Sequence, residues 1–408
     1  MKLFSALIIA SLLLSSCQKN QEKATENPTI QRIESPADGN ASLPYLIKGG
    51  DDLLYMSWVE KRDSGWIDLK YSVQKEDIWQ TPEVIASGND WFVNWADYPM
   101  MAVDKQGNMI AHFLAKSSSG TYSYDVNVVY KPVGGEWSEP IIPHDDGTPT
   151  EHGFVTMLPK NDGTFLLSWL DGRNTGGGDH DSGGHGGGGA MTIRTATLDM
   201  MGNLTQEAEL DSRVCDCCQT GGAMTLNGPV IVYRDRSEEE MRDMSFVRLV
   251  DNNWTEPKVV NSDGWKIAGC PVNGPRIAAF GNTTATAWFT AAEGIAKVKV
   301  TFMDDSGASF QEPIIVDDSV SVGRVDIVMI DNQSAYVSWL DLEGETPFIK
   351  FRKVSRDGSM NDLTIVSETS ASRGSGFPQM EVIDDTLYFA WTDMNDQTTS
   401  IKCGIFKP

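Results

Sequence analysis

An aromatic residue that recurs seven times within short apolar segments constrains this chain more than any other feature of its 408 residues. Apolar runs of strand length flank each copy, and turn residues separate them. The seven segments are Ser57-Trp58-Val59-Glu60, His112-Phe113-Leu114-Ala115, Ser168-Trp169-Leu170-Asp171, Val232-Tyr233-Arg234-Asp235, Ala287-Trp288-Phe289-Thr290, Ser338-Trp339-Leu340-Asp341 and Ala390-Trp391-Thr392-Asp393. The aromatic positions are 51 to 64 residues apart, and four strands in a repeat of this length indicate a propeller blade. We therefore predict an all-β, seven-bladed β-propeller of four-stranded antiparallel blades.

The two ends of the chain are predicted to complete one blade together. The last repeat, Phe377 to Lys407, supplies only three strands, whereas Thr29 to Glu34 is a spare strand near the N-terminus. Closure by this strand removes the open sheet edges that invite pairing with other chains. We expect the recurrent aromatics to pack between blades. The acid two places after the aromatic, present in five blades, is expected to anchor loops.

The N-terminus predicts export and lipid anchoring. Lys2, an apolar run to Leu14 and the ending Leu14-Ser15-Ser16-Cys17 form a secretion signal that resembles a bacterial lipobox. We therefore expect a signal peptide over 1–17 with Cys17 as the lipidated residue, a flexible tether over 18–28, and the propeller over 29–408. Cys17 would attach the protein to the outer membrane. The segment from Gln18 to Lys23 is similar to surface-export signals, so surface display and periplasmic residence both remain open.

The charge balance excludes nucleic acid as a partner. The formal net charge is −24, and the basic residues are scattered, so no basic patch is available to bind phosphates. An acidic glycan would need a local group of arginines, because guanidinium binds carboxylates bidentately. The candidates for substrate binding are Arg173, Arg234, Arg236, Arg324 and Arg373. Arg324 is the strongest of them, because it begins the strand that should line the channel of its blade.

A cysteine cluster distinguishes blade 4 from the regular repeat. Cys215, Cys217 and Cys218 open this blade, and Cys270 opens the next one, so the four sulfurs are expected to meet at the channel rim. Disulfides are the usual outcome in an exported protein. The alternative is a thiolate site for zinc or copper, because Cys215 and Cys218 have C-x-x-C spacing.

Blade 3 departs from the repeat through a glycine-rich loop between Arg173 and Gly189. This loop contains His180 and His185, which make a second possible metal or ligand site, although a solvated loop without a site is the alternative. Tyr233, Asp235 and His180 are the candidate catalytic residues, because a tyrosine or histidine beside an acid can transfer protons.

The segment Asp305-Ser306-Gly307-Ala308-Ser309-Phe310 resembles the Asp-box turn of sialidase-like, or BNR-repeat, propellers. The Cys-x-Cys-Cys motif resembles the hallmark of one subgroup of these exported proteins. The resemblance implies the propeller fold and a carbohydrate ligand. Sialidases have six blades and a catalytic set of an arginine triad, a Tyr/Glu pair and an Asp, and this set has no residue-by-residue match here.

The sequence thus leads to a lipid-anchored propeller that binds or cleaves an acidic glycan at its channel rim, as a glycoside hydrolase or a polysaccharide lyase if it is an enzyme. Two alternatives stay open. One is a metal-binding or redox protein of the envelope that uses the cysteine cluster. The other is a scaffold that presents the propeller face to another envelope protein.

Overall fold

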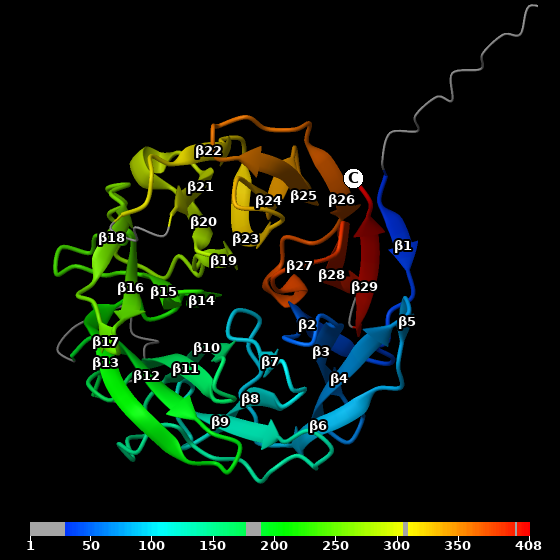
Figure 1. Cartoon of the computed structure of the whole chain (residues 1–408), viewed down its shortest axis with the longest axis vertical. Coiled ribbons are helices and arrows are strands. Elements are labelled where there is room, and N and C mark those ends of the chain that lie inside the picture. Colours follow the sequence, from blue (N-terminus) through cyan, green and yellow to red (C-terminus); the bar gives the residue numbers. More distant parts are fainter. Residues whose placement is uncertain (1–28, 177–188, 305–308, 396–397) are drawn as a thin grey trace, which may run out of the picture.

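Seven antiparallel sheets surround a central channel in the computed structural model of this chain, which describes residues 29–176, 189–304, 309–395 and 398–408 (Figure 1). This arrangement confirms the predicted seven-bladed propeller. The predicted signal peptide, Cys17 and the tether lie outside the described residues, as do His180, His185 and positions 305–308 of the Asp-box. No helix within the described ranges is long and apolar enough to cross a membrane.

The strands follow the chain from the channel outward in each blade. Blade 1 comprises β2 (Ala41–Lys48), β3 (Leu54–Lys61), β4 (Ile67–Lys75), β5 (Ile78–Trp79) and β6 (Glu83–Gly88). Blade 2 comprises β7 (Met101–Val103), β8 (Met109–Lys116) and β9 (Tyr124–Lys131). Blade 3 comprises β10 (His152–Pro159), β11 (Phe165–Asp171), β12 (Met191–Leu198) and β13 (Leu204–Val214). In blade 2 the fourth strand is reduced to a single bridge between Val128 and Ile141.

The remaining blades keep the same order. Blade 4 comprises β14 (Gly221–Thr225), β15 (Gly228–Arg234), β16 (Met244–Val250), β17 (Asn253–Trp254) and β18 (Lys258–Asn261). Blade 5 comprises β19 (Arg276–Phe280), β20 (Thr283–Thr290), η2 (Ala292–Gly294), β21 (Lys297–Met303) and β22 (Ile314–Asp317). Blade 6 comprises β23 (Ser321–Met329), β24 (Ser334–Glu343), β25 (Thr346–Ser355) and β26 (Thr364–Glu368). Blade 7 comprises η3 (Arg373–Ser375), β27 (Gln379–Ile383), β28 (Thr386–Asn395) and β29 (Thr398–Phe406).

The N-terminal strand β1 (Gln31–Ile33) closes the ring as predicted. It pairs antiparallel with β29, with Arg32 opposite Gly404, and forms the outer edge of blade 7. Figure 1 shows β1 beside β29 on the rim of the disc. The first and last strands of the propeller therefore share one sheet, and this pairing ties the two ends of the ring together.

The recurrent aromatics form the core between blades, which confirms their predicted structural role. All seven are buried, and Trp58 of blade 1 packs with Ala390 and Cys403 of blade 7. Trp339 of blade 6 packs in the same way against Val298 of blade 5. Burying an aromatic of this size stabilises the fold by roughly 3 kcal/mol.

A bulge recurs in the innermost strands of blades 1, 3 and 6. The register shifts after Ser42, Gly153 and Gly323, and the following residues Leu43, Phe154 and Arg324 have positive φ angles of 55°, 53° and 52°. A bulge turns the side chain away from the alternation of the strand. Leu43 and Phe154 are buried at this position, so Arg324 occupies a place that is apolar in two other blades.

Candidate functional site

The cysteine cluster lies between blades 3 and 4, in the connection from β13 to β14. The Cys215 sulfur is 3.4 Å from that of Cys218 and 3.9 Å from that of Cys217. Cys215 and Cys218 are buried, Cys217 is partly exposed, and Cys270 is exposed and interacts with Cys217 from the loop before β19. Three of the four sulfurs therefore converge, and Cys270 contacts the group through Cys217.

The spacing of the sulfurs suits a metal ion better than a disulfide. A disulfide requires about 2.05 Å between its sulfurs, and the five cysteines of the described ranges are all free thiols. Zinc–sulfur bonds of about 2.3 Å at tetrahedral angles place neighbouring sulfurs about 3.8 Å apart. The sulfurs of Cys215, Cys217 and Cys218 all lie within 4.8 Å of one another, so small adjustments would bring one ion into contact with all three.

Arginines surround the thiols and supply positive charge. Arg242, which is fully buried, donates from Nη1 to the Cys215 sulfur at 3.1 Å. Arg236 binds Asp216, inside the Cys-Asp-Cys-Cys turn, with an Nη1–Oδ2 distance of 2.9 Å. Glu240 holds both arginines, at 2.7 Å from each. This network fixes the turn, and its two guanidinium groups are balanced by the two carboxylates.

The thiols differ in acidity because their surroundings differ. Burial raises the pKa of Cys215 to about 11. Burial also opposes ionisation of Cys218, but the hydrogen bonds from Cys215 and Cys217 and the charge of Arg234 outweigh it and lower the pKa of this thiol. Cys218 is therefore the thiol of the cluster that most readily presents a thiolate to an incoming ion.

The predicted substrate-binding arginines mostly contact the protein itself. Arg234 donates to the carbonyls of Asn273, Arg242 and Phe289. Arg236 forms the ion pairs of the cysteine turn. Arg173 binds Asp171 bidentately, at 2.7 and 2.8 Å.

The two remaining arginines of this group meet at blade 7. Arg324 donates to Ser375 and to the carbonyls of Ala371, Ser372 and Gly376. Of the five, only Arg373, in η3, is classed as exposed. The geometry thus gives four of them structural contacts, which sequence could not reveal because their acceptors are mainly backbone carbonyls and loop acids.

The two described candidate catalytic residues, Tyr233 and Asp235, make structural contacts. Tyr233 is fully buried, and its hydroxyl donates to Asp211 at 2.7 Å, so it has the packing role of the six aromatics that match it in the other blades. Asp235 accepts from the backbone of Arg236 and from Ser245, which is the loop-anchoring role predicted for this position. His180 is outside the described residues. The prediction of catalysis by these residues gains no support from the geometry.

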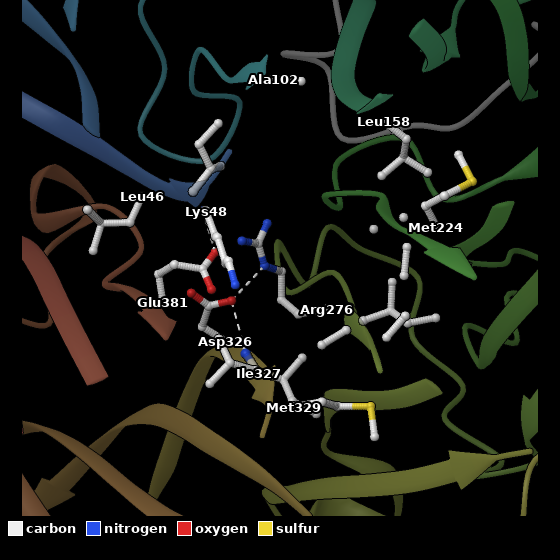
Figure 2. Close-up of a pocket in the computed structure, with 18 of the residues that line it drawn as sticks. Leu46, Lys48, Ala102, Leu158, Met224, Arg276, Asp326, Ile327, Met329 and Glu381 are labelled. Carbon is white, nitrogen blue, oxygen red and sulfur yellow. Dashed lines mark hydrogen bonds and ion pairs between the residues drawn. The ribbon is translucent and has the colours of Figure 1, made fainter. Parts of the chain in front are cut away.

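The central channel holds a cavity of about 500 Å³ lined by the innermost strands. Figure 2 shows Arg276 reaching into it beside Asp326 and Glu381. The Arg276 Nε lies 3.0 Å from Asp326 Oδ1, and both carboxylates also accept backbone N–H groups of a neighbouring blade, from Met380 and Lys48. These residues join adjacent blades, and the sequence analysis did not single them out.

Two histidines were also missed. His144 and His152 lie at the junction of blades 2 and 3 and are buried beside three aspartates. The available signal was that only five histidines occur in the chain and that two of them flank Asp146 closely in sequence. The glycine-rich loop with His180 and His185 is a stronger signal, because it places two histidines in one segment that departs from the repeat.

Comparison with known proteins supports the fold. No family model matches the chain, and no curated protein matches it. A protein of unknown function from Dyadobacter fermentans is similar over 90% of this chain and 94% of that chain, with a TM-score of 0.52 and 12% identity. The NanB sialidase of Streptococcus pneumoniae covers 95% of this chain and 72% of its own, with a TM-score of 0.46 and 11% identity. A polysaccharide lyase covers 94% and 90%, with a TM-score of 0.47 and 11% identity, so the structures that this chain is similar to include both sialidases and lyases.

Proposed function

We propose that this protein is an exported, lipid-anchored propeller that binds a thiophilic metal ion, copper(I) or zinc, at the junction of blades 3 and 4. The observation that carries the proposal is the convergence of the Cys215, Cys217 and Cys218 sulfurs within 4.8 Å. Soft thiolate ligands select these ions. The buried Arg242 donates to the Cys215 sulfur and so favours the thiolate form of this ligand.

The test is metal analysis of the full-length protein purified without chelators. We expect stoichiometric copper or zinc in the wild type and at least about tenfold weaker binding in Cys217→Ser, which removes the least buried of the three ligands. Cys403→Ser is the matched control, because Cys403 is a buried thiol in β29, on blade 7. Metal-free protein in which alkylation reveals disulfides among the cluster would overturn the proposal.

A second candidate function is binding of an acidic carbohydrate unit. The channel cavity is a better candidate for this binding site than the channel rim that the sequence predicts. The volume of about 500 Å³ lies within the range of small-molecule sites. Arg276 extends into this cavity (Figure 2), and a guanidinium is the group that best binds a sugar carboxylate. Asp326 accepts a hydrogen bond from the Nε of Arg276 and so orients the rest of the guanidinium group.

Binding of uronate oligosaccharides and sialyllactose to the wild type and to Arg276→Lys tests this candidate. Lysine keeps the positive charge near Asp326 but loses the bidentate geometry, so we expect at least about tenfold weaker binding. Arg373→Lys, at an exposed position of η3, is the control. Equal affinity of all three proteins would refute a role for the cavity, and ultraviolet absorbance of an unsaturated product would reveal lyase activity.

A further inference from the structure

The His144 and His152 rings are stacked in the interior of the propeller. Their centroids are 3.8 Å apart and their planes differ by 9°. The side chains are 3% and 0% exposed, yet His144 Nε2 and both ring nitrogens of His152 make no hydrogen bond of good geometry with any described residue. Buried polar atoms without partners are rare in proteins, and a bound ion or an ordered water can satisfy them.

Two carboxylates face opposite edges of the stack. Asp146 Oδ2 lies 3.3 Å from His144 Nδ1 and 3.1 Å from His152 Nε2. On the other edge, Asp125 Oδ1 lies 3.9 Å from His144 Nε2 and 3.5 Å from His152 Nδ1. A carboxylate this close to one nitrogen of each ring favours the tautomer with the proton on that nitrogen, which leaves the other nitrogen with a free lone pair, as outer carboxylates do in metal sites.

Among the described residues, the charges of the cluster do not balance without a further cation. Asp125, Asp146 and Asp171 contribute three negative charges, and Arg173, which binds Asp171 and approaches Asp146 to 3.5 Å, contributes one positive charge. Arg194 is 4.0 Å from Asp171 but makes its close ion pair with Glu209. About two positive charges are therefore missing.

One divalent ion supplies this charge better than two protons. If both rings were protonated, two imidazolium ions would stack with their centroids 3.8 Å apart. Like charges at this distance oppose double protonation. A metal ion delivers both charges at one point.

We propose that Asp125, His144 and His152 bind a divalent transition-metal ion of the zinc class, with Asp146 as the outer carboxylate. The three ligand atoms lie within 4.8 Å of one another, and bonds of about 2.0 to 2.1 Å at tetrahedral angles need about 3.4 Å. Because the rings are parallel, the His144 ring tilts out of the stack to direct its lone pair at the ion. The Asp125 side chain is 21% exposed and gives solvent access.

The edge of the histidine pair at Asp125 is favoured over the edge at Asp171 as the position of the ion. Both Asp171 oxygens accept from Arg173, and Trp169 also donates to one of them, so this carboxylate has no lone pair directed at an ion. Within the described ranges, the ion pairs of Asp125 are with His144 and His152 only. The proposed ion therefore adds charge where no guanidinium repels it.

Cobalt(II) titration of the full-length protein tests the site, because cobalt bound by nitrogen and oxygen gives visible bands without the near-ultraviolet sulfur-to-cobalt band. We expect such bands in the wild type and at least about tenfold weaker binding in Asp125→Asn. Asp146→Asn should weaken binding about ten- to a hundredfold while leaving the visible bands in place at saturation. Asp145→Asn is the matched control, since it removes the same charge from an exposed neighbour.

The outcomes separate this site from the thiolate site. Visible bands that Asp125→Asn abolishes and Cys217→Ser retains support the histidine site whatever happens at the cysteines. A sulfur-to-cobalt band alone, unchanged by Asp125→Asn, would refute it. Equal melting temperatures of Asp125→Asn and the wild type show that the variant is folded. A melting temperature of the wild type that rises with acid but not with cobalt would assign the missing charge to protons.

Discussion

Arg324→Met tests whether Arg324, the strongest predicted ligand contact, instead stabilises the contact between blades 6 and 7. The side chain is 5% exposed and donates 2.7 Å and 2.8 Å hydrogen bonds to the Gly376 carbonyl and Ser375 Oγ, which are buried. It also lies 4.9 Å from the centre of the Trp95 ring. Burial lowers its pKa to about 10, so the guanidinium is still charged at neutral pH.

The cost of the substitution follows from these acceptors. Each buried acceptor that loses its donor costs about 1 to 3 kcal/mol. The carbonyls of Ala371 and Ser372 belong to exposed residues and regain water. Methionine fills part of the volume and removes a buried charge, which offsets some of the loss, so we expect a net destabilisation of about 2 to 4 kcal/mol. With an unfolding entropy of about 2 cal/mol/K per residue, the melting temperature falls by about 2 to 5 °C.

Thermal unfolding followed by circular dichroism measures this effect, and Arg373→Met in the neighbouring η3 is the control. The control removes the same charge from an exposed position and should stay within about 0.5 kcal/mol of the wild type. An unchanged melting temperature in Arg324→Met, together with lost binding of an acidic glycan, would refute the structural role of Arg324 and favour its predicted role as a ligand contact.

Two further predictions concern the same face of the propeller. Burial raises the pKa of Glu151 to about 8 from 4.5, so the folded protein retains a proton that the unfolded chain releases, and this contribution to stability is lost as the pH rises from about 4.5 to about 8. Melting temperatures across this range should therefore fall less steeply in Glu151→Gln, and parallel curves would contradict the shift. Gly323→Ala should lower stability and also metal binding at the cysteines. At this position φ is +84°, and a Cβ would lie 2.3 Å from Asn273 Oδ1, beside the Cys270 loop. Metal content and melting temperature measure both effects, and a wild-type value for either would contradict this.

The fold was predictable because its information is repeated. Seven buried aromatics at blade spacing are sufficient to indicate the ring, and a spare strand at one end indicates the closure. The cysteine cluster was predictable for the opposite reason, since blade 4 departs from the repeat. Sequence patterns show which residues are unusual, and the register of the blades shows which unusual residues are neighbours.

The partners of the charged residues were not predictable in the same way. Arg234 and Arg324 look like ligand contacts in sequence, but their donors reach backbone carbonyls in other blades, and any residue type can supply such an acceptor. His144 and His152 escaped notice because their acids come from β9, a loop and the end of β11. The local spacing of His144, Asp146 and His152 does not reveal Asp125 and Asp171, which reach the cluster only when blades 2 and 3 meet.

Glu151, through its buried carboxyl, interacts electrostatically with residues of the cysteine cluster. It precedes His152 in the chain, and its pKa is raised first by burial and then by the charges of Asp97, Asp216 and Cys270. Tyr124 donates to its carboxyl at 2.5 Å. A cation at the cysteines offsets the charges of Asp216 and Cys270, so it favours the ionised form of Glu151 and lowers this pKa. The pH window in which Glu151→Gln differs from the wild type should therefore move to lower pH when the thiolate site is loaded.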